Sequence, residues 1–214
     1  MNARTLALLV TLTLSAGYVD AVAFFGLGVF TANMTGNTVL LGGALAAHWI
    51  GNVSLAGSIG IGLPLLSIAA FVAGALAGAW ALRGETGRPP VRTIAPLVVI
   101  VALFALAAGL QRDGAAMVPV AIAALSIAMG LQSVVAVRAG VPGVTTTFVT
   151  GTLVTAVVRF EGMPEPHRAE AGTNAAIWGC YLTGAVLGTL GLHALGVNAL
   201  WIPAVVVALL TGVV

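Results

Sequence analysis

The chain has 214 residues, of which 60% are hydrophobic and only 7% are charged. A soluble domain carries about a quarter charged residues, so this composition excludes a water-soluble protein and indicates an integral membrane protein. The formal net charge of +2 includes eight basic residues, all of them arginine, which fits loop arginines that set membrane topology rather than nucleic-acid binding. The single cysteine, Cys180, excludes an internal disulfide.

Eight apolar segments follow one another along the chain, at about 5–28, 34–50, 54–82, 93–111, 115–137, 144–158, 172–195 and 197–214. A membrane-spanning helix needs about 20 residues, and the second and sixth segments are shorter than that. Polar stretches at 83–92, 111–114 and 159–172 separate the longer segments. We predict one integral membrane domain over residues 1–214.

The arginines distinguish between two topologies. If all eight segments cross the membrane, the arginines divide evenly between its two sides. If the two short segments instead enter and return on one side, only Arg112 lies outside and the other arginines face the cytoplasm. Because cytoplasmic loops are enriched in basic residues, the second topology is favoured. We predict an all-α polytopic membrane protein with six transmembrane helices, two short re-entrant half-helices and both termini in the cytoplasm.

Each short segment is accompanied by a threonine-rich cluster. The first reads FTANMTGNTV from Phe30, and the second reads TTTFVTGTLV from Thr145. Non-helical backbone at membrane depth has to be buried in protein or line an aqueous cavity, because lipid cannot satisfy its polar groups. We therefore predict an irregular or strand-like segment around 28–35, a half-helix from about Thr35, and the same arrangement before a half-helix at Thr150.

The two halves of the chain, about 1–110 and 111–214, are predicted to be inverted repeats. In the six-helix topology the first helix runs outward before its threonine cluster, whereas the helix at 115–137 runs inward before the second cluster. FVAGALAGA at 71–79 also matches YLTGAVLGT at 181–189. The glycines of these segments, spaced four residues apart, favour close helix packing or a dimer interface.

Two half-helices that enter from opposite faces would place their N-termini near the middle of the membrane. Free N–H groups and a partial positive charge at such ends suit a polar or anionic solute, and broken helices at a repeat interface indicate a transport site. Threonine and glycine in membrane helices also serve packing alone, which is the alternative. The candidate substrate-binding residues are Thr31, Asn33, Thr35, Gly36, Asn37, Thr146, Thr147, Thr150, Gly151 and Thr152.

Asp20 is the only acidic residue deep within an apolar run. An ionisable residue inside the membrane indicates a coupling site or a proton relay, and the alternative is a structural ion pair with Arg138 that locks the two halves. Tyr18 and Gln132 are candidate cavity-lining residues. Asn174 is predicted to cap the helix at 172–195. The spacing of His, Cys and acidic residues favours neither a catalytic set nor a metal site, and no cofactor is expected.

The chain resembles the YoaK-like family of bacterial membrane proteins over nearly its whole length. The segment AGYVDAVAFFGLGVFTANMTGNTV carries the resemblance, through Gly17, Asp20, Thr31, Asn33, Thr35, Gly36 and Asn37. The resemblance implies six spanning helices in a bacterial inner membrane and supplies no substrate. The threonine-rich segment before a half-helix is also similar to the substrate-site element of nucleobase and sulfate-type transporters, by analogy of fold alone.

We therefore expect a transporter or facilitative channel for a small polar or anionic solute, with no enzyme activity. A chain this short has little room for a separate scaffold, so we also expect a homodimer. The alternative is an intramembrane enzyme that acts on a lipid or isoprenoid substrate. Such enzymes bring a set of carboxylate, His or Ser groups to the membrane surface, whereas Asp20 stands alone. A third hypothesis is a non-transporting assembly or sensor subunit.

Overall fold

The structure is a computed structural model, which describes residues 3–51, 60–84, 94–110, 115–139, 154, 157 and 167–211. Within these residues there is no β-strand. These described residues include seven α-helices and two short 3-10 helices with defined bounds: α1 (Ala3–Leu27), α2 (Met34–Trp49), α3 (Gly62–Ala81), α4 (Ile94–Leu110), η4 (Ala115–Met117), α5 (Val118–Arg138), α7 (His167–Leu195), η5 (Gly196–Leu200) and α8 (Trp201–Thr211). The predicted all-α fold is confirmed.

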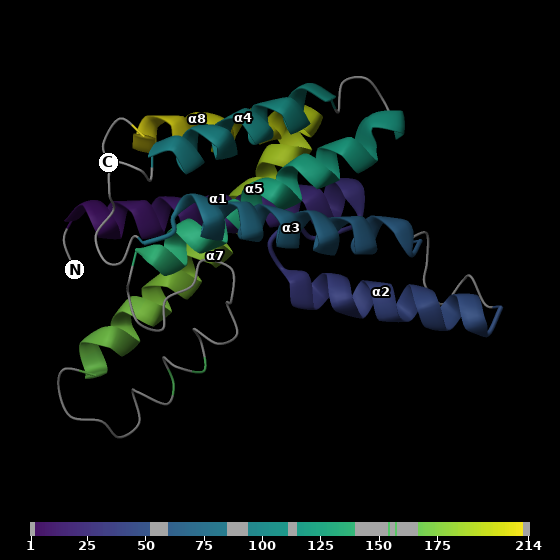
Figure 1. Ribbon diagram of the computed structural model, residues 1–214, viewed down its shortest axis with the longest axis horizontal. Helices are drawn as coiled ribbons and strands as arrows, with labels where there is room; N and C mark the ends of the chain where they lie inside the picture. The colour runs from purple at the N-terminus through teal and green to yellow at the C-terminus, as the bar shows by residue number, and fades with distance from the viewer. Residues whose placement is uncertain are drawn as a thin grey trace.

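The helices alternate in direction along the long axis of the molecule. In Figure 1, α1 runs from left to right, α3 returns, and α4, α5, α7 and α8 continue this alternation. Both chain termini therefore lie at the left end of the bundle. Helix α2 is the exception, because it runs in the same direction as α1. The chain has to double back between these two helices.

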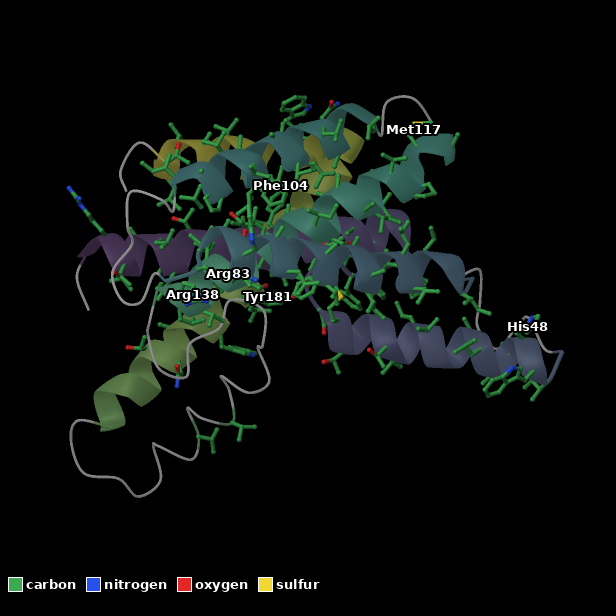
Figure 2. All side chains as sticks on the ribbon, viewed as in Figure 1. His48, Arg83, Phe104, Met117, Arg138 and Tyr181 are labelled. Carbon is green, nitrogen blue, oxygen red and sulfur yellow. The ribbon has the colours of Figure 1, made fainter. Side chains whose placement is uncertain are left out.

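Helices α1 and α5 form the centre of the bundle. In their most apolar stretches 72% and 67% of the residues are buried, compared with 28% for α3 and 17% for α7. Helix α1 packs mainly against α7, and α5 packs mainly against α3. Helices α4 and α8 pack against each other and cover α5 and α1, with Phe104 of α4 fully buried at the position labelled in Figure 2.

The outer faces of the bundle are apolar. Leu76 and Trp80 on α3 and Leu190 on α7 are each more than half exposed. Four of the described helices, α1, α3, α5 and α7, are long and apolar enough to cross a membrane, and α4 and α8 are shorter apolar helices. Large exposed hydrophobic side chains on such helices suit contact with lipid.

Glycine residues allow the two main helix pairs to approach closely. At each of four positions, a Cβ atom would overlap the main-chain carbonyl group of the facing helix: Gly17 with Tyr181, Gly184 with Leu14, Gly130 with Phe71, and Gly74 with Ile127. Small residues permit this kind of contact in membrane proteins. The glycines of the matched segments therefore serve packing within the chain.

The start of the helix predicted at 172–195 differs from the structure. Helix α7 begins at His167, although residues 159–172 were expected to form a polar loop. Polar side chains do not prevent a helix, and the alanines of this stretch favour one. Asn174 consequently lies inside α7, so its predicted role as an N-cap is wrong. The predicted half-helix at 144–158 lies almost entirely outside the described residues.

Candidate functional site

A short irregular turn between α1 and α2 carries the chain back, so that α2 then runs in the same direction as α1. Gly28 has a φ of +81°, which glycine adopts readily, and its N–H donates to the carbonyl of Phe24 at the end of α1. The ring of Phe30 then stacks on that of Phe24, with a centroid distance of 4.4 Å. Asn33 caps α2 by accepting a hydrogen bond from the N–H of Gly36 at 3.1 Å. The irregular segment and a helix start near Thr35 are therefore observed, and the strand-like form is not.

Asp20 of α1 holds this turn in place. Its Oδ1 accepts from the N–H groups of Thr31 at 2.8 Å and Ala32 at 2.7 Å, and from the Thr31 hydroxyl at 3.3 Å. Its Oδ2 accepts from the N–H of Asn33 at 3.0 Å and from the Tyr181 hydroxyl at 2.6 Å. An ionised carboxylate only accepts hydrogen bonds, so it suits a position where five donors converge. Asp20 is 2% exposed, and its carboxylate lies just before α2, at the kind of position where helices bind anions.

A second group of hydrogen bonds joins the same turn to α3 and α5. The amide of Asn37 accepts from the N–H of Phe30 at 2.9 Å and donates to its carbonyl at 2.7 Å. The hydroxyl of Ser67 on α3 donates to the same carbonyl at 2.7 Å, and it accepts from Asn37 at 2.9 Å. Because the single proton of Ser67 is used in this way, Ser126 on α5 has to be the donor in their 2.8 Å contact. Every polar group of this network is satisfied.

The predicted residues of the first cluster have different environments. Thr31, Asn33 and Asn37 take part in the hydrogen bonds described above. Gly36 lies beneath the Phe30 ring, where a Cβ atom would come within 2.6 Å of a ring carbon, so its role is packing. Thr35 is exposed on the first turn of α2, and its hydroxyl has no hydrogen-bond partner among the described residues. The Thr35 side chain is therefore open to a ligand.

The remaining predicted residues are not part of this cluster. Tyr18 donates to the carbonyl of Ala199 at 3.0 Å, and Gln132 donates to the carbonyl of Leu12 at 2.7 Å. Arg138 ends α5 and is not among the hydrogen-bond partners of Asp20. The alternative of an Asp20–Arg138 ion pair is therefore not what the described contacts show. The second threonine cluster lies outside the described residues: Thr146, Thr147, Thr150, Gly151 and Thr152.

Three polar residues of the site were missed from the sequence, namely Tyr181, Ser67 and Ser126. Figure 2 places Tyr181 near the centre of the molecule, where helices from both ends of the chain meet. The available signal was weak, because each is a single hydroxyl within a long apolar run. Among the described residues, no group of three His, Cys, Asp or Glu side chains could hold a metal ion.

The apolar helices and their lipid-compatible outer faces make this chain a helical transmembrane protein. It belongs to the family described as protein of unknown function (DUF1275), which its residues 8–213 match. It is 36% identical over 149 residues to the UPF0700 transmembrane protein YoaK of Bacillus subtilis (strain 168). That match covers 68% of this chain and 63% of the relative, so the chain spans less than two thirds of the relative's length. No solved structure matches. The resemblance to the YoaK-like family is confirmed.

Proposed function

We propose that this protein is a transporter or facilitative channel for a small polar solute, with no enzymatic activity. The observation that carries the proposal is a buried polar turn within an apolar bundle, followed by a helix whose first turn exposes Thr35. Polar groups at membrane depth are costly unless they are paired, so they are characteristic of solute and ion pathways. Asp20 is surrounded by donors, which suits a residue that holds the backbone better than a catalytic acid or base.

An inverted repeat of six crossings and two half-helices is part of this proposal. Gly17 on α1 meets the main-chain carbonyl of Tyr181 on α7. Gly130 on α5 meets that of Phe71 on α3. Phe71 and Tyr181 are the first residues of the matched segments FVAGALAGA and YLTGAVLGT, so equivalent positions make equivalent contacts. Helices α1 and α5 run in opposite directions in Figure 1, which supports inversion of the two halves.

The arginines support a cytoplasmic position for both termini, in a bacterial inner membrane. Arg4 lies near the start of α1, Arg83 follows α3, and Arg138 ends α5. All three positions belong to the end of the bundle that carries the termini, and Figure 2 labels Arg83 and Arg138 toward that end. Basic residues are retained on the cytoplasmic side. We extend the proposal to a homodimer.

The described half of the site favours a neutral solute over an anion. The three N–H groups that precede α2 already bind Asp20. An anion that approached this end would meet a carboxylate rather than free donors, and like charges repel most strongly where water is scarce. We therefore propose that the Thr35 hydroxyl contacts a neutral polar solute. The cluster from Thr146 to Thr152 would supply the other half of the site.

The test measures the entry of glycerol, acetamide and sodium formate into proteoliposomes. Stopped-flow light scattering records the rate of entry of each solute. We expect faster entry of at least one neutral solute than into protein-free liposomes. The variant Thr35→Val/Thr150→Val should lose that excess. The matched control Thr38→Val should keep it, because the Thr38 hydroxyl bonds to the carbonyl of Met34 within its own helix. Entry of every solute at the rate of protein-free liposomes would contradict the proposal.

A further inference from the structure

Two polar side chains at the crossing of α1 and α5 are incompletely paired. Gln132 of α5 is fully buried, and its Nε2 donates to the carbonyl of Leu12 on α1 at 2.7 Å. Its Oε1 has no hydrogen-bond partner within the described part of the chain. Ser15 of α1 is 3% exposed, and its hydroxyl also has no partner there. Each group is therefore removed from water without a hydrogen bond from any described residue.

Both groups belong to one small region of the bundle. Ser15 follows Leu12 by three residues, so the two lie next to each other on one face of α1. Gln132 reaches that face through its bond to the Leu12 carbonyl. The two unpaired groups are chemically complementary, since the amide oxygen accepts a hydrogen bond and the hydroxyl can both donate and accept.

Unpaired buried polar atoms are rare in native proteins, and an ordered ligand or water is the usual explanation. By contrast, Asp20, Asn37 and Ser67 in the network at the turn before α2 are all hydrogen-bonded. The buried amide of Asn174 on α7 is, like Ser15 and Gln132 Oε1, without a partner among the described residues. We propose that a small neutral ligand with a donor and an acceptor binds between Ser15 and Gln132. Water and the hydroxyl or amide group of a small solute both have this chemistry.

This position is separate from the turn before α2, and its pair of polar residues has no counterpart at the repeat-equivalent positions. If Gly17 and Gly130 are equivalent positions of the two repeats, the position equivalent to Ser15 is Ala128, which is buried and apolar. In the same alignment of the repeats, the position equivalent to Gln132 is Val19, which is also buried and apolar. A helix crossing of this type therefore needs no polar groups for its packing. The proposed ligand site goes beyond the transport proposal and does not depend on it.

The first test is the melting temperature of two variants at equivalent positions, Ser15→Ala and Ala128→Ser. If a ligand pairs with Ser15, Ser15→Ala removes a hydrogen bond and should lower the melting temperature by about 2–4 °C. Ala128→Ser should also lower it, because it buries a hydroxyl with no ligand to pair with. If Ser15→Ala instead raises the melting temperature or leaves it unchanged, the Ser15 hydroxyl is truly unpaired and the proposal is overturned.

The second test is a density map of the protein, prepared in solute-free buffer and again with glycerol or acetamide. We expect density within hydrogen-bond distance of Ser15 Oγ and Gln132 Oε1, and none at that place in Ser15→Ala. Density that is the size of a water in both buffers identifies water, and larger density with added solute identifies the solute. A direct Ser15–Gln132 hydrogen bond with no density between them would overturn the proposal. Neither test measures flux, so their failure leaves the transport proposal standing.

Discussion

The hydroxyl of Tyr181 donates a 2.6 Å hydrogen bond to Oδ2 of Asp20, across 161 positions of the chain. This bond joins α7 to the carboxylate that holds the turn between α1 and α2. The main-chain carbonyl of Tyr181 also faces Gly17, one turn before Asp20 on α1. The close helix contact and the buried hydrogen bond therefore depend on each other.

The variant Asp20→Asn should destabilise the protein. An amide NH2 in place of one carboxylate oxygen would face donors instead of accepting from them, and the charge that strengthens the remaining bonds would be lost. We expect a loss of about 2–3 kcal/mol of stability. This corresponds to a fall in melting temperature of roughly 5–10 °C in detergent. A wild-type melting temperature combined with loss of proton-coupled flux would instead assign Asp20 to coupling.

The variant Tyr181→Phe removes one hydroxyl and keeps the ring. We expect a smaller loss, about 1 kcal/mol, or about 2–4 °C in melting temperature. Thr183→Val is the matched control on α7, since the exposed Thr183 hydroxyl bonds only to the carbonyl of Gly179, and it should change little. The double variant Asp20→Asn/Tyr181→Phe should lose less stability than the sum of the losses of the two single variants. Full additivity would argue that the two side chains are independent.

The variant Ser67→Ala should be more harmful than the loss of one hydroxyl suggests. Ser67 donates to Phe30 and accepts from both Asn37 and Ser126, so its removal leaves buried donors without an acceptor. We expect a cost of about 2–3 kcal/mol, measured as the shift of the thermal unfolding midpoint. Thr38→Val, on the exposed side of α2, is the control with an expected change near zero. Equal effects of the two variants would contradict the role assigned to the network.

The glycines at the helix contacts should respond to substitution according to their surroundings. Gly17→Ala and Gly130→Ala each place a Cβ against main-chain atoms, which cannot move aside as a side chain can. We expect both variants to lose monodisperse protein in size-exclusion chromatography. Gly179→Ala has no atom within 4 Å of the added Cβ and should elute as the wild type does. Normal elution of both Gly17→Ala and Gly130→Ala would show that the bundle is looser than described.

The sequence predicted the helical elements well, because long apolar runs in a chain with few charges have few alternatives to membrane helices. It also predicted the irregular segment near Gly28 and the helix that follows it. The partners of Asp20 could not be predicted in the same way. Tyr181 lies in the other half of the chain, and a single tyrosine in an apolar helix gives no indication of which face it presents.

The sequence alone also does not reveal whether the N–H groups at the start of α2 are free, as an anion site there would need. A helix N-terminus identified from sequence is assumed to have free N–H groups. Here the chain supplies its own carboxylate, from Asp20, which is eleven residues before Thr31. The six crossings, the second half-helix and the dimer stay predictions. Arg112, which is the one arginine expected outside in the six-crossing topology, lies outside the described residues.

The two halves differ next to the glycine contacts that they share. In the alignment set by Gly17 and Gly130, the position equivalent to Asp20 is Ser133. In the matched segments, the position equivalent to Tyr181 is Phe71. Neither replacement can form the carboxylate–hydroxyl bond of the first half. In a carrier whose two halves swap conformations between its inward-open and outward-open states, these two states would therefore differ in free energy. The strength of a single interhelical bond would set how often the less stable one is visited.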